Sequence, residues 1–81
     1  MSSFVVNDLV IAIGRQDNKV DEAAVVCLAG IELFPNSTVL RQRIAEYYVL
    51  KGDKAAAALA YQKALVADPY NQVAAVALKK L

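Results

Sequence analysis

The chain offers one side chain with nucleophilic chemistry, Cys27, and it has no histidine to act as its general base. Val25, Val26 and Leu28 lie next to it in the sequence. Reactive thiolates need an electropositive, partly exposed setting, so this apolar neighbourhood predicts a buried, inert thiol. A single cysteine also excludes an internal disulfide and a cysteine-cluster zinc site.

The adjacent carboxylates Asp21 and Glu22 are the next candidates for chemistry, as a general acid and base. They open an expected helix, where negative charge is favoured by the helix dipole, so we interpret them as helix-start residues. The sequence has no glycine-rich phosphate loop and no metal-ligand spacing. We therefore predict a protein that is not an enzyme and that needs no cofactor and no metal ion.

Charge and composition narrow the kind of partner. Nine Lys and Arg residues against eight Asp and Glu residues give a net charge of +1, which provides no field to attract nucleic acid or anionic lipid. No stretch approaches the ~20 apolar residues of a membrane span, and no basic leader segment precedes the first apolar run. We expect a cytoplasmic protein with a protein or peptide partner, no nucleic acid and no membrane span.

Apolar residues make up 58% of the 81-residue chain. A chain of this size buries about 60% of its surface on folding, so part of this apolar content is expected to form an exposed patch. The spacing of the apolar residues is helical and shows no strand-like alternation. It predicts five helices joined by short turns, over residues 3–15, 20–33, 37–50, 54–67 and 71–80.

Residues that begin or end helices recur at a spacing of 34. Pro35 and Pro69 each close a helical run, and turn residues occur at 17–19 and again at 51–53. Ser3, Ser37 and Asn71 are candidates for N-caps, and Asp53 for a turn and cap. A repeat of this length with two helices in each unit predicts a stack of helical hairpins.

The second unit resembles the tetratricopeptide repeat (TPR) family. The matching places are Ile44, Ala45, Tyr48, Gly52, Asp53, Ala57, Tyr61, Ala64, Asp68 and Pro69. Arg41 stands where the family often has a tryptophan. The first unit departs from the motif, with Ile11 at a small-residue place and Gly14 and Cys27 at aromatic places.

The resemblance implies an all-α fold, a right-handed stack of antiparallel helical hairpins (a TPR-like α-solenoid) with five helices. The expected single domain spans residues 1–81. Repeat one covers about 4–37, repeat two about 38–71, and a capping helix about 72–81.

In the TPR family the first helix of each unit lines a concave surface, and this places the expected partner site. The predicted strip is apolar in its middle, and its valines are expected to have no packing partners within the chain. Its members are Val5, Asp8, Ala12, Val39, Gln42, Glu46, Val49, Val73 and Val76. These residues cannot form the Lys and Asn clamp by which TPR co-chaperones hold the acidic C-termini of heat-shock chaperones.

The resulting function hypothesis is an adaptor or chaperone-like module that binds a peptide or a partner helix in an apolar groove. One alternative is a self-assembling homo-oligomer, whose apolar faces pack against each other. Another is a non-catalytic appendage, because the segments 19–23, 32–37 and 51–54 are similar to repeat tails of some bacterial serine hydrolases.

Overall fold

A computed structural model describes residues 2–15 and 19–81. This part of the chain contains five helices and no strand, so the predicted all-α class is confirmed. The helices are α1 (Ser3–Gly14), α2 (Val20–Leu33), α3 (Thr38–Leu50), α4 (Lys54–Ala67) and α5 (Gln72–Lys80). The predicted turn at 17–19 falls partly outside the described residues, since 17 and 18 are not among them.

Polar side chains cap four of the helices at their N-termini. The oxygens of Ser37, Asp53 and Asn71 each accept a hydrogen bond from the backbone N–H three residues later, at 3.1–3.3 Å. The cap of α1 is Ser2 rather than the expected Ser3, and it accepts from Val5 N at 3.3 Å. Each cap satisfies an N–H group that the first helical turn leaves without a partner.

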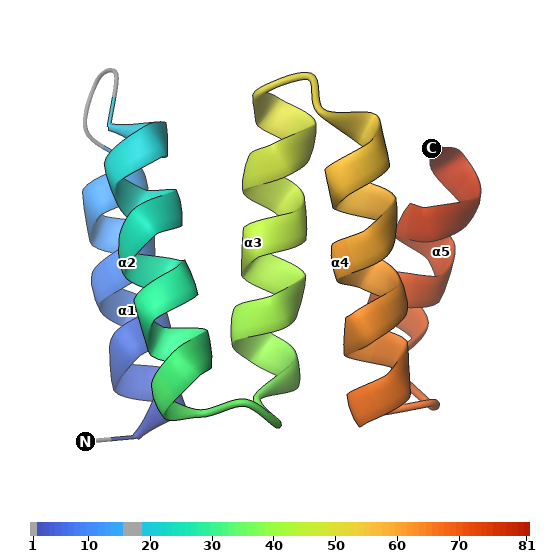
Figure 1. Cartoon of the computed structure of the whole chain (residues 1–81), viewed down its shortest axis with the longest axis horizontal. Coiled ribbons are helices and arrows are strands. Elements are labelled where there is room, and N and C mark those ends of the chain that lie inside the picture. The colour runs from blue at the N-terminus through green and yellow to red at the C-terminus, as the bar shows by residue number, and fades with distance from the viewer. Residues whose placement is uncertain (1, 16–18) are drawn as a thin grey trace.

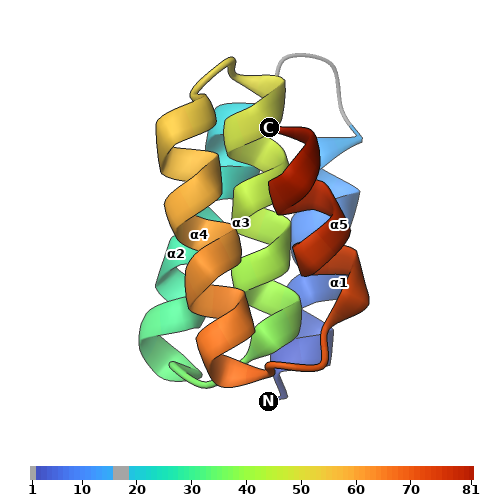
Figure 2. The same ribbon diagram turned by 90° about the vertical axis from the view of Figure 1, so that its right-hand side faces the viewer.

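The helix α3 lies at the centre of the molecule and packs against α1, α2 and α4, while α5 packs against α4. Successive helices run in opposite directions (Figure 1). Figure 2 shows α2 and α4 on one side of α3, and α1 and α5 on the other. We call these two sides the α2–α4 face and the α1–α5 face.

The core is built largely from small residues. Five alanines are completely buried, at positions 23, 45, 57, 64 and 74, and the largest completely buried side chains are Leu40, Val10 and Cys27. Alanines at helix contacts let the backbones approach closely, and three of the five, Ala45, Ala57 and Ala64, occupy matching places of the motif. None of the helices in the described part of the chain has the length and apolar character needed to cross a bilayer.

Not every apolar side chain of the helical pattern lies in the interior. Tyr48 is only partly buried, whereas its neighbour Tyr47 is buried. Val49 and Leu59 are exposed. Because a helix turns about 100° per residue, Val49 lies about 140° round α3 from the buried Ile44, away from the core.

Candidate functional site

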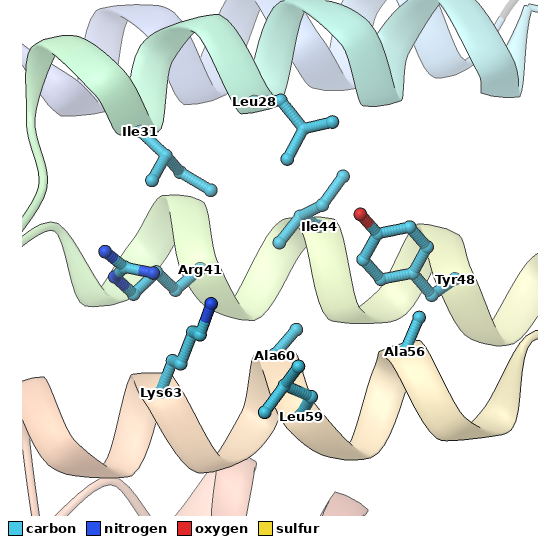
Figure 3. Close-up of a pocket in the computed structure, with 9 residues that line it drawn as sticks. All are labelled: Leu28, Ile31, Arg41, Ile44, Tyr48, Ala56, Leu59, Ala60 and Lys63. Carbon is cyan, nitrogen blue, oxygen red and sulfur yellow. The ribbon is translucent and has the colours of Figure 1, made fainter.

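The α2–α4 face contains a surface cavity of about 220 Å³. Helices α2, α3 and α4 all contribute to its walls, and most of the lining side chains are apolar (Figure 3). The lining residues are Leu28, Ile31, Arg41, Ile44, Tyr48, Ala56, Leu59, Ala60 and Lys63. We refer to this cavity as the α2–α4 cavity.

Helical spacing explains why these residues share one cavity. On α3, Arg41, Ile44 and Tyr48 follow one another at intervals of three and four, which aligns them along one side of the helix. On α4, Ala56 and Ala60 lie one turn apart, and their methyl side chains leave room that larger residues would fill. The cavity is therefore a consequence of small residues on α4 opposite longer ones on α2 and α3.

Two cations stand at one end of the α2–α4 cavity and Tyr48 at the other (Figure 3). The Nε of Arg41 donates a hydrogen bond to the carbonyl oxygen of Pro35 at 2.9 Å, which fixes the side chain beside the opening. Lys63 is exposed. Within the described residues, neither cation forms an ion pair. The same two side chains also line an adjoining depression with Pro35 and Val66, so the positive end opens onto further surface.

The residues in the middle of the predicted strip on α3 are polar, and their side chains bond to other side chains of the chain. Arg43 Nε donates to Asn7 Oδ1 on α1 at 3.1 Å, and its guanidinium also pairs with Glu46. Asn71 Nδ2 donates to Gln42 Oε1 at 3.1 Å. Gln42 and Glu46, two of the predicted strip residues, are thus engaged within the chain.

The α3 valines of the strip also differ from each other. Val39, expected to lack packing partners, is partly buried and packs against the core, so that expectation was wrong for this residue. Val49 is 43% exposed and lies free of the core, as predicted.

The strip residues of α1 lie on one exposed side of that helix. Val5, Asp8 and Ala12 are all exposed, and because a helix turns about 100° per residue they lie within about 60° of one another around its axis. Asn7, which faces α3 through Arg43, lies about 100–160° from them, so this side of α1 is turned away from α3.

The strip residues on α5 are on the surface. Val73 and Val76 are 58% and 50% exposed, and they line a shallow depression with Gln72, Ala77 and Lys80. These two valines form an apolar edge on the last helix of the chain. They remain candidates for contact with another molecule.

The candidate chemical groups Cys27 and Asp21 each have a bonding partner within the chain. The Cys27 thiol is completely buried and donates to the Leu40 carbonyl oxygen at 3.1 Å. Burial raises its pKa to about 11, which disfavours the nucleophilic thiolate. Asp21 Oδ1 accepts from Lys51 Nζ at 2.7 Å and raises the pKa of that amine. In the described part of the chain, no three metal-binding side chains cluster.

Searches of protein-family models, of curated proteins and of solved structures find no match to this chain. The α2–α4 cavity was not expected from the sequence, and Leu28, Leu59 and Lys63 were not among the predicted site residues. One feature of the sequence was consistent with the cavity. Arg41 occupies a place where the TPR motif often has a tryptophan, and it puts a charged side chain at the edge of an apolar space.

Proposed function

We propose that the chain is a non-catalytic protein-interaction module, a TPR-like stack of helical hairpins, that binds a peptide or partner helix in the α2–α4 cavity. The observation that carries this proposal is the cavity itself. It is an open, mostly apolar space on the surface, beside a core cluster that includes Ile44 and Ala60. Clefts lined by apolar residues with a few polar groups are the usual form of a binding site.

Further observations support the proposal. Leu28 and Leu59, on opposite walls of the cavity, remain 43% and 53% exposed, which offers apolar area to an incoming side chain. The buried Cys27, with its raised pKa, is unsuited to nucleophilic catalysis. The TPR-like arrangement is supported by the central position of α3 and by the Gly52 turn between α3 and α4.

A displayed library of random helical peptides, selected on the purified chain, tests the proposal. We expect the enriched peptides to lose binding to the double variant Leu28→Ser with Leu59→Ser. The matched control is Val73→Ser with Val76→Ser, which changes two exposed residues on α5 and should leave binding intact. Peptides sensitive only to the α5 variant would move the site to the α1–α5 face, and failure to enrich any peptide would contradict the proposed function.

Self-association is a second candidate, favoured by the exposed Val73 and Val76 on the last helix. A second copy covering this apolar edge would remove it from water. Sedimentation velocity over a range of concentrations measures this directly. A monomer at every concentration contradicts self-association, whereas a dimer that Val73→Ser with Val76→Ser dissociates supports it.

A further inference from the structure

We infer that the occupant of the α2–α4 cavity is an acidic amphipathic segment of a partner protein, with apolar side chains in the cavity and a carboxylate at its Arg41–Lys63 end. This inference rests on the proposed function and adds the chemistry of the partner. The observation behind it is charge at one end of an otherwise apolar space. Arg41 and Lys63 share that end, and neither has an acidic partner within the described residues.

The hydrogen bonding of Arg41 leaves it able to hold a carboxylate. Its Nε is engaged by the Pro35 carbonyl oxygen. Its two terminal nitrogens have no hydrogen bond within the described residues, and a guanidinium presents such nitrogens in a geometry that matches carboxylate oxygens. The Lys63 ammonium adds a second positive charge at the same opening. Charge-assisted hydrogen bonds of this kind are the stronger ones in proteins.

The shape of the cavity suits the side chains of a larger partner. Its volume is about 220 Å³, and at its Arg41–Lys63 end it continues into a more open depression of about 480 Å³, so the space runs along the surface instead of enclosing a ligand. It extends along α3 from Arg41 to Tyr48, seven residues apart. At 1.5 Å per residue this corresponds to about 10 Å, or two turns of a partner helix. Two apolar side chains one turn apart, with an acidic residue in the next turn, match that length.

The net charge of the chain does not account for a preference for acidic partners. With a balance of +1, the whole surface is close to neutral, so selection of acidic partners would come from the local pair of cations. Elsewhere, Arg43 is paired with Glu46, and Lys51 with Asp21. The Arg41–Lys63 end therefore differs from these neutralised sites.

The charge of the selected peptides tests the inference. The probes are the peptides enriched from the unbiased library, read by sequencing and then measured singly by fluorescence anisotropy. We expect an excess of Asp and Glu in the turn next to the apolar anchors, on either side of them. Replacing both cations, Arg41→Gln with Lys63→Gln, should weaken binding roughly tenfold or more, and added salt should weaken binding to the unmodified chain.

The matched control is Lys79→Gln with Lys80→Gln, which removes the same charge from the exposed end of α5 and should change affinity less than about twofold. Circular dichroism shows whether the Arg41 substitution disturbs the fold. If it does, the single variant Lys63→Gln, at an exposed position, is used for the test instead.

Enriched peptides that need Leu28 and Leu59 but show no acidic excess, or that ignore the loss of both cations, would overturn this inference and leave the proposed function standing. Failure to enrich any peptide would overturn both.

Discussion

The hydroxyl of Tyr47 on α3 donates a hydrogen bond to the backbone carbonyl oxygen of Val10 on α1, at 3.2 Å. The bond lies in the interior, where Tyr47 is buried and its pKa is raised by that burial. The ring also covers Gly14, since a β-carbon built there would lie 2.6 Å from the Tyr47 hydroxyl oxygen. Gly14 is therefore required by the close approach of α1 and α3.

Gly14→Ala should destabilise the fold by about 1–2 kcal/mol, because the hydrogen-bonded Tyr47 hydroxyl cannot move aside without losing its partner. Tyr47→Phe removes that oxygen and should itself cost about 1 kcal/mol. The double variant should lose less stability than the sum of the losses in the two single variants, by at least about 0.5 kcal/mol. Urea denaturation of the four proteins measures this coupling, and strictly additive values would contradict the proposed packing.

The Cys27 thiol should be protected from alkylation in the folded protein. With the pKa raised from 9.0 to about 11, roughly one thiol in a thousand is ionised at pH 8, against about one in ten for an unperturbed group. Complete burial slows the reaction further. Iodoacetamide labelling followed by mass spectrometry should be slow in buffer and fast in urea, and rapid labelling of folded protein would contradict the burial.

The same shift predicts a loss of stability at alkaline pH. The folded state holds the Cys27 proton between pH 9 and 11, where the unfolded chain has released it, so the free energy of unfolding falls as pH rises through this window. The fall due to this group is about 2–3 kcal/mol. Cys27→Ala should show a shallower decrease than the unmodified chain in urea titrations. Tyr47 and Tyr61, whose pKa values burial also raises, contribute in the same direction in both proteins.

The second hairpin was predictable from sequence because its signals are local. Ser37 and Asp53 lie directly before the helices they cap, and Gly52 lies in the turn. The close packing of α1 against α3 was not predictable in this way. It depends on contacts such as that of Tyr47 with Gly14, which are far apart in the sequence. In the sequence alone, Gly14 is only a departure from the aromatic residue of the motif.

The α2–α4 cavity was missed for a related reason. It is formed where three helices meet, and an apolar residue such as Leu28 has the same spacing whether it faces a neighbour or an open space. The pairing of Arg43 with Asn7 was missed too, because it joins side chains 36 positions apart.

Gly52 has a φ of +81°, which side chains other than glycine rarely adopt. The turn is closed by two hydrogen bonds, from Gly52 N–H to Val49 O at 3.0 Å and from Asp53 N–H to Tyr48 O at 2.9 Å. Gly52→Val should therefore cost about 1–2 kcal/mol, although no atom lies within 4 Å of the added β-carbon. Asparagine tolerates this conformation, so Gly52→Asn should lower the melting temperature clearly less than Gly52→Val does. Equal melting temperatures for the two variants would mean that the turn relaxes to another shape.

The predicted strip contains two valines of α3, and substituting them tests which part of this surface is free of packing contacts. Val39 is partly buried against the core, whereas Val49 is 43% exposed. Serine and valine have similar helix propensities, so the same substitution at both sites compares packing rather than helix formation. Val39→Ser should lower the free energy of unfolding by about 1–2 kcal/mol, through lost apolar burial, and Val49→Ser should stay within about 0.5 kcal/mol. Similar losses at both positions would show that the α1–α5 face is covered in solution, as a homo-oligomer would cover it. Because that cover would come from another copy, the loss at Val49 would then shrink as the protein is diluted, while the loss at Val39 would not.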